Sequence, residues 1–501
     1  MNKARRALAT GVVGAMALTA ACSSSGTDTA GPTPDGGSAS TVSRGTAVAR
    51  GTSTAGADVA VPEVARLEGG KGVPFAAMPA ALADEHDYVE EEFVLSGDAT
   101  SYDEGGPWGT DGRWTATPAD TAPYTTRILV RRPADPAAFD GTVLVEWLNV
   151  SSGQETDVDF GHLNPELLDH GTVWVGVSAQ KAGVEGGGAA FEIPGVDPVP
   201  LVEWDPERYG ELRHPGDDYS YDILSQVAAA LRRPGAVDPL GGLEPQQIIA
   251  AGESQSGARL ATYINAVHPL AEIYDGYLVH SRSDGGSALD TDTPVAPPLY
   301  AQIRTDLDVP VLQFVTETDL FGLPFIEARQ PDSDHLRTWE VAGTAHLDRG
   351  MLDYRYAVAG LDAPPDPDPI VERCGRINEG PQGPVLRAAF SALRRWVAGG
   401  APPAEAPPIE VAGDAVARDE LGIALGGIRT PAVDAPTVVL RGDNLTSTDY
   451  VCALFGSTAE LDPAAFDARF PTDAAYDESE ASSLEAAVEA GFLLAADAPQ
   501  G

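Results

Sequence analysis

Gly252-Glu253-Ser254-Gln255-Ser256-Gly257 lies between a strand-like run, 247–251, and a helix-like run, 258–267. A serine at a sharp turn from a strand into a helix is lifted above the edge of a sheet, where its hydroxyl is accessible. The start of the following helix presents free N–H groups and the positive end of its dipole to nearby negative charge. The stretch therefore predicts an α/β fold in which Ser254 is a nucleophile.

Other Gly-x-Ser triplets lack this setting. Ser38 and Ser53 lie in sequence of low complexity, and Ser287 lies in a loop rich in Gly, Ser and Asp. Ser178 ends a strand-like run, but no clear helix follows it. Only Ser254 has both flanks, although Ser256 stands where such turns usually carry glycine.

A nucleophilic serine needs a base, and the base needs an acid that orients it. On α/β sheets of this type the chain order is serine, acid, histidine. The apolar run 309–315 is followed by Glu317 and Asp319, and a later strand ends just before His346. We expect His346 to be the base and Asp319 to be the acid, with Glu317 as the alternative acid.

Two backbone N–H groups are expected to bind the oxyanion that forms on the attacked carbonyl. One belongs to Gln255, the residue after the nucleophile. The other belongs to the loop that follows the apolar strand 142–148, where Asn149 and Val150 are the candidates.

The remaining strand-like runs are apolar and alternate with helical runs, which predicts a mostly parallel sheet with helices on both faces. The expected strands are 88–95, 124–131, 142–148, 172–177, 247–251, 274–279, 309–315 and 337–341. The expected helices are 219–231, 258–267, 385–397 and 478–490. The segment from 401 to 501 is expected to be an extension packed on a core that spans 59–400.

Four motifs together resemble the bacterial alpha/beta hydrolase domain family. They are 145–151 (VEWLNVS), 216–219 (GDDY), 252–257 (GESQSG) and 426–431 (GGIRTP). The resemblance covers the chain from about residue 59 onward. It implies an alpha/beta-hydrolase fold with Ser254 as the nucleophile, but it implies no substrate.

The first residues indicate export. Three basic residues precede a short apolar stretch, 7–21, which is too short to span a membrane and is typical of a signal peptide. The run 18–25 resembles the lipobox of bacterial lipoproteins, which implies cleavage before Cys22 and a lipid on that cysteine. Residues 22–58 are rich in Ser, Thr, Gly and Pro and are expected to form a disordered tether. We expect the protein at the outer face of the cell membrane, or secreted if Cys22 carries no lipid.

Cys374 and Cys452 are the only other cysteines. An even pair in an exported protein favours a disulfide, with two buried thiols as the alternative.

The chain carries 75 acidic against 32 basic residues, a formal net charge of -43. A surface of this charge repels phosphate, so nucleic acids and anionic head groups are poor partners. We find no pattern typical of a metal site and expect neither a metal nor a cofactor. The expected membrane contact is the lipid on Cys22 alone.

Together these features predict an exported, lipid-anchored serine hydrolase, favoured to be a carboxylic ester hydrolase that acts on a small or polymeric ester. One alternative is a ligand-binding lipoprotein without catalysis, in which Ser254 is a polar turn residue. The other is a peptidase or acyltransferase on the same fold.

Overall fold

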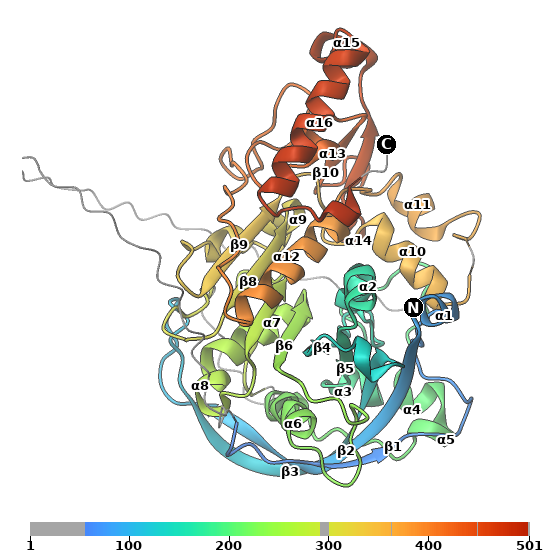
Figure 1. Ribbon diagram of the computed structural model, residues 1–501, viewed down its shortest axis with the longest axis vertical. Coiled ribbons are helices and arrows are strands. Elements are labelled where there is room, and N and C mark those ends of the chain that lie inside the picture. The colour runs from blue at the N-terminus through green and yellow to red at the C-terminus, as the bar shows by residue number, and fades with distance from the viewer. Residues whose placement is uncertain (1–55, 291–299, 362, 448, 499–501) are drawn as a thin grey trace, which may run out of the picture. The chain divides into compact units, whose positions relative to one another are not determined.

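Six strands form the parallel part of a central sheet (Figure 1). The computed structural model describes residues 56–290, 300–361, 363–447 and 449–498. Within these ranges nine strands share one sheet in the order β1-β2-β3-β5-β4-β6-β7-β8-β9. Its parallel strands are β4 (Thr142–Trp147), β5 (Val173–Val177), β6 (Gln247–Glu253), β7 (Gly276–His280), β8 (Val311–Thr316) and β9 (Leu336–Val341). Every residue of β4 to β8 is buried, as the continuous apolar runs predict for a sheet that is covered on both faces.

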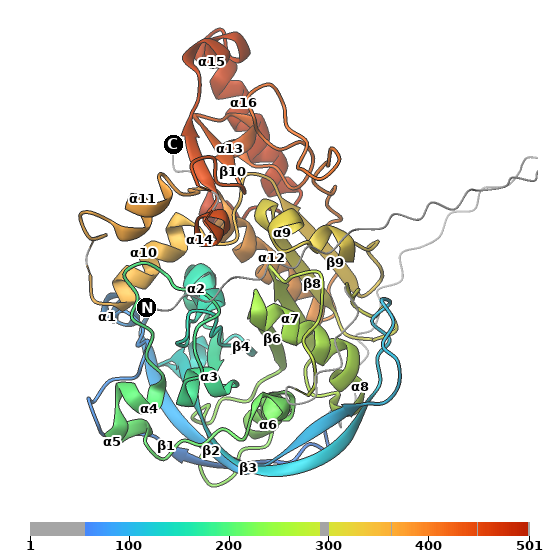
Figure 2. The same cartoon turned by 180° about the vertical axis from the view of Figure 1, so that it is seen from behind.

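The other three strands, β1 (Glu63–Arg66), β2 (Tyr88–Glu104) and β3 (Ala116–Pro133), pair antiparallel. The sequence predicted only about half of β2 and β3, because their outer halves are polar and lack an apolar face. Cross-strand backbone pairing holds these halves, with one irregularity between Thr100 and Tyr102. The resulting ribbon curves around helix α6 (Ser220–Arg232) in both views (Figures 1 and 2).

Helices cover the two faces of the sheet and create two hydrophobic cores. One core contains buried residues of α6 and of α7 (Gln255–Thr262), which continues as a π-helical turn over Tyr263–Val267. The other contains buried residues of α2 (Val158–His170) and α12 (Gln382–Val397). The remaining α-helices described before the extension are α1 (Ala80–His86), α3 (Lys181–Glu185), α4 (Leu201–Trp204), α5 (Pro206–Tyr209), α8 (His268–Ala271), α9 (Glu317–Gly322), α10 (Arg349–Val358) and α11 (Pro369–Cys374).

Glu146, the second residue of the motif at 145–151, is a buried carboxylate that holds the start of α2. It accepts the backbone N–H groups of Asp159 and Phe160 at the start of α2, each at 2.9 Å, and the indole N–H of Trp174 at 2.8 Å. Burial and the neighbouring carboxylates raise the pKa of Glu146 well above its usual value. The contacts satisfy N–H groups that a helix start leaves unpaired, and they fix the loop between β4 and α2.

The described residues of 401–498 contain a two-stranded antiparallel sheet, four α-helices and a short 3₁₀ helix, Ala495–Asp497. The elements are α13 (Pro431–Asp434), β10 (Val438–Arg441), α14 (Tyr450–Leu454), β11 (Ser457–Glu460), α15 (Pro463–Arg469) and α16 (Asp473–Glu489). The motif at 426–431 also has a physical role, because Ile428 pairs in parallel with Val341 at the end of β9. The extension thus continues the edge of the central sheet.

A disulfide joins Cys374 at the end of α11 to Cys452 in α14, so the predicted pairing is present in the structure. Both cysteines are buried in an apolar cluster with Ile377, Val451 and Phe455.

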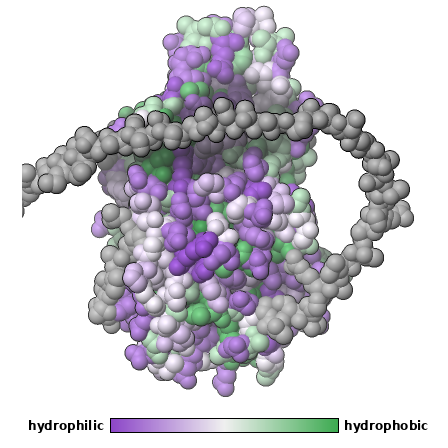
Figure 3. Space-filling view, turned by 90° about the vertical axis from the view of Figure 1, so that its left-hand side faces the viewer, coloured by the Kyte–Doolittle hydropathy of each residue, from purple (hydrophilic) through white to green (hydrophobic). Residues whose placement is uncertain are grey.

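Across the described ranges, no helix combines the length and apolar composition needed to cross a bilayer. Hydrophilic and hydrophobic residues are interspersed on the face drawn in Figure 3. The predicted signal peptide, Cys22 and the tether up to residue 55 lie outside the described residues.

Replacement of both cysteines, Cys374→Ala with Cys452→Ala, is expected to lower the free energy of unfolding by about 3 kcal/mol, because the unfolded chain regains the entropy of a long closed loop. Urea titration of the variant and of the oxidised wild type measures this difference. Equal unfolding free energies would show that the crosslink does not stabilise the fold.

Candidate active site

Ser254 occupies a strained turn between β6 and α7. Its backbone angles are φ 56° and ψ -117°, a left-handed conformation that a serine rarely adopts. Its N–H donates to the carbonyl of His280 on the neighbouring strand at 2.9 Å. The helix starts at Gln255, three residues earlier than the sequence predicted, because this turn takes a single residue.

The glycines beside Ser254 are required by close packing. A Cβ on Gly252 would lie 2.9 Å from the carbonyl oxygen of Ser256, and a Cβ on Gly257 would lie 2.9 Å from the carbonyl oxygen of His280. Ser256 itself fits because its hydroxyl is buried and donates to the carbonyl of Leu148 at 3.4 Å. This contact explains why serine can stand where glycine is usual.

The structure brings Ser254, His346 and Asp319 into one hydrogen-bonded chain. The Nε2 atom of His346 lies 3.0 Å from Oγ of Ser254, and its Nδ1 atom lies 2.8 Å from Oδ1 of Asp319. His346 is 3% exposed and Asp319 is fully buried. The second oxygen of Asp319 accepts the N–H of Thr316 at 2.7 Å, so the same carboxylate also caps α9. Its orientation is therefore held from two sides.

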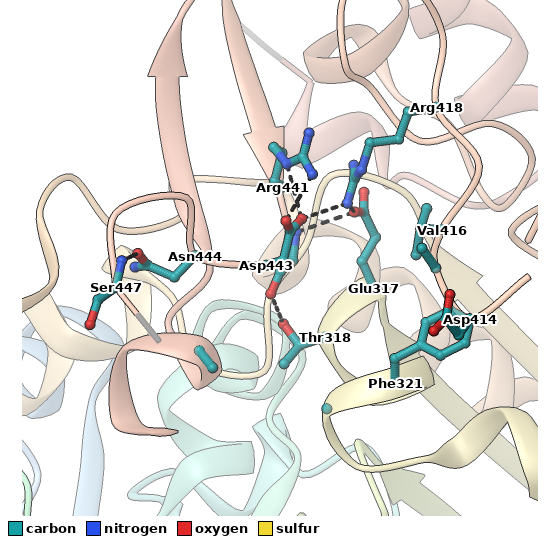
Figure 4. Close-up of a pocket in the computed structure, with 14 residues that line it drawn as sticks. Glu317, Thr318, Phe321, Asp414, Val416, Arg418, Arg441, Asp443, Asn444 and Ser447 are labelled. Atoms are coloured by element: carbon teal, nitrogen blue, oxygen red, sulfur yellow. Dashed lines mark hydrogen bonds and ion pairs between the residues drawn. The ribbon is translucent and has the colours of Figure 1, made fainter. Parts of the chain in front are cut away.

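Glu317, the alternative acid, points elsewhere. Its carboxylate accepts the N–H groups of Gly343 and Gly442 and pairs with Arg418. Figure 4 shows this side chain directed toward Arg418. Glu317 is the residue that begins α9, whereas Asp319 lies two residues later and faces the imidazole.

Asn149 and Val150, the two loop candidates for the oxyanion site, differ in whether their backbone N–H groups are already hydrogen-bonded. The N–H of Asn149 already donates to the carbonyl of Thr156 at 3.0 Å. Within the described part of the chain, the N–H of Val150 has no acceptor. Gln255 is the first residue of α7, where N–H groups have no partner inside the helix. Val150 and Gln255 are thus the pair whose N–H groups are available to a ligand.

Glu253, which the sequence analysis did not single out, lies against the same imidazole. Its Oε1 is 3.1 Å from Nε2 of His346, and its Oε2 accepts the side-chain amide of Asn149 at 2.9 Å. The sequence does not predict this contact, because Glu253 is the last residue of a buried strand and nothing in the strand pattern indicates where its side chain points.

The two buried groups shift each other's titration. Burial raises the pKa of Glu253 to about 7, although the nearby His346 and His280 act in the opposite direction. Burial alone would lower the pKa of His346, but the carboxylates of Glu253 and Asp319 outweigh it and raise that pKa. The imidazole therefore binds a proton more readily than a free histidine does.

An apolar cavity of about 90 Å³ lies beside Leu347, the residue after His346. Its walls include Val158 and Met351, and the loop residues Ser152 and Gln154 line it as well. This loop is the one that carries Val150. In the described ranges, no three His, Cys, Asp or Glu side chains gather as a metal site.

Residues 59–500 match the model of a protein family described as an alpha/beta hydrolase domain. No curated protein sequence matches the chain. Among solved structures, esterase Est22 is similar at 14% identity and TM-score 0.31, over 64% of this chain and 84% of that chain. A fungal esterase from Rhizomucor miehei is similar at 12% identity and TM-score 0.25, over 53% and 81%. A lipase/esterase from Lactobacillus plantarum is similar at 13% identity and TM-score 0.25, over 44% and 80%. Likenesses this distant carry no argument about a substrate.

Substitution of Glu253 is expected to move the pH dependence of the site. Only a neutral imidazole accepts a proton, so kcat/KM rises with pH through the pKa of His346. Because the Glu253 carboxylate raises that pKa, Glu253→Gln is expected to shift the acid limb of the profile to lower pH. The measurement is kcat/KM for an aryl ester across the limb. An unmoved limb, or one at higher pH, would contradict the assigned coupling.

Proposed function

Since the chain belongs to the alpha/beta hydrolase domain family, we propose that it is a serine hydrolase that cleaves carboxylic esters. The observation that carries the proposal is the unbroken contact from Asp319 through His346 to Ser254. Asp319 is proposed as the acid of this triad in preference to Glu317, whose carboxylate is engaged by Arg418.

The proposed reaction begins when Oγ of Ser254 attacks the ester carbonyl carbon. The hydroxyl proton passes to Nε2 of His346 as the new C–O bond forms. We assign the binding of the negative carbonyl oxygen to the N–H groups of Gln255 and Val150, in the manner of a preorganised oxyanion site. Asp319 holds the imidazole by Nδ1 and stabilises its charged form.

The tetrahedral intermediate then expels the alcohol. His346 returns the proton to the leaving oxygen as its bond to carbon breaks, which leaves an acyl group on Ser254. A water molecule repeats the sequence, with His346 again as the base, and releases the carboxylic acid. Esters are favoured over amides because an alkoxide leaves more easily than an amide nitrogen.

The apolar cavity beside Leu347 supports a further element of the proposal, a binding place for the acyl group. A volume of about 90 Å³ is well below that of typical small-molecule sites. It suits a short acyl chain, so turnover is expected to fall as chain length increases.

The covalent step gives the direct test. A fluorophosphonate probe is expected to label the wild type and to leave Ser254→Ala unlabelled, as detected by intact mass. Asp319→Asn is expected to slow the labelling by roughly 10³- to 10⁴-fold, because the imidazole then adopts the wrong tautomer. A folded wild type that never labels would rule out the enzyme and favour the ligand-binding alternative. Panels of esters, amides and thioesters separate esterase from peptidase or acyltransferase activity.

The proposed location is the outer face of the cell membrane, with the enzyme held by lipid on Cys22. The basic and apolar residues that precede Cys22 support it. Cys22→Ala is expected to move the protein from the membrane fraction to the soluble fraction, as measured by fractionation and immunoblotting. A wild type that is already soluble would count against the anchor and leave secretion.

A further inference from the structure

A cavity of about 420 Å³ is lined by residues of α9 and of the extension, several of them charged (Figure 4). Arg418 bridges two carboxylates on it, with Nη2 at 2.9 Å from Glu317 and 2.7 Å from Asp443. Arg441 also lines the cavity, but among the described residues its guanidinium pairs only with Asp443. The two arginines therefore share one partner and differ in their contact with Glu317.

The Glu317 carboxylate accepts hydrogen bonds from two turns that are far apart in the sequence. Its Oε1 accepts the N–H of Gly343 at 2.5 Å, and its Oε2 accepts the N–H of Gly442 at 3.2 Å. Gly343 lies three residues before His346, and Gly442 follows β10 in the extension. A Cβ on Gly442 would lie 2.4 Å from Cβ of Glu317, so the two backbones approach closely only because Gly442 has no side chain.

Thr318 makes a second link between the same segments. Its hydroxyl accepts the N–H of His346 at 3.1 Å and donates to the carbonyl of Gly442 at 2.6 Å. The backbone of His346 is therefore hydrogen-bonded to α9. The same Thr318 hydroxyl connects it to the extension. Asn378 adds a third link, since its amide donates to the carbonyls of Gly343 and Arg441.

The charges explain why Arg418 matters to these links. Glu317 is buried, and burial raises its pKa, whereas Arg418 and the two backbone N–H groups act against that rise. Removal of a partner from a buried ion pair leaves an uncompensated charge, which then protonates or rearranges. Loss of Arg418 would therefore weaken the hold of Glu317 on Gly343.

We propose that Arg418, Glu317 and Thr318 are positioning residues, through which the extension holds the His346 turn so that the imidazole stays between Asp319 and Ser254. The inference rests on the proposed function and assigns the extension a part in it. A displacement of about 1 Å in a catalytic group can cost on the order of 100-fold in rate. Small shifts of this turn are therefore sufficient to be measured.

The experiment compares matched variants of the full chain by ester turnover and by the rate of fluorophosphonate labelling. Arg418→Gln is expected to lower kcat by on the order of 10- to 100-fold with little change in KM, because the ester-binding walls are untouched. Arg441→Gln removes an arginine from the same cavity and from the same partner, and is expected to leave kcat within about 2-fold. Thr318→Val is expected to lower kcat as Arg418→Gln does, whereas Thr318→Ser keeps both hydrogen bonds and restores it.

Equal kcat values for Arg418→Gln and Arg441→Gln, or for Thr318→Val and Thr318→Ser, would overturn the positioning roles. If Arg418→Gln does not fold, as judged by its thermal unfolding, the threonine pair decides. A purely structural role would lower the unfolding temperature without separating kcat from KM, and would also overturn the inference. A wild type that is never labelled would instead overturn the proposed function itself.

Discussion

The left-handed conformation of Ser254 is the constraint on which the site depends. Such a conformation costs roughly 1–3 kcal/mol for a residue with a side chain. The surrounding structure holds it in place: β6 is buried between β4 and β7, the N–H of Ser254 is bonded to His280, and two glycines allow α7 to pack against the turn. The hydroxyl is therefore delivered to the edge of the sheet before any substrate arrives.

Buried carboxylates organise the rest of that edge. Glu146 binds the start of α2, Glu253 binds Asn149, Glu317 binds Gly343 and Asp319 binds His346. Each is out of water, so each must be compensated by N–H donors or by a cation. A loop whose N–H groups are bonded to a buried carboxylate has few alternative conformations, because any other conformation would leave that carboxylate unpaired. These contacts therefore fix the positions of the triad side chains.

The parts of the fold that sequence reasoning recovered are those with a strong local pattern. The apolar strands, the serine turn and the positions of Asp319 and His346 after two of these strands follow from periodicity and chain order. The outer halves of β2 and β3 were missed, because backbone pairing holds polar residues there. The contact of Glu253 with His346, and the choice between Glu317 and Asp319, depend on side-chain directions across separate strands. No local pattern records such directions.

The disulfide between Cys374 and Cys452 has a consequence for the integrity of the chain. The segment it encloses includes residues 411–415, which are all exposed and lie outside the named helices and strands. A protease that cleaves the chain within residues 411–415 would leave two fragments that the Cys374–Cys452 disulfide still joins. The piece that carries Gly442 would then stay attached to the piece that carries Ser254, and the cut alone would not release the extension.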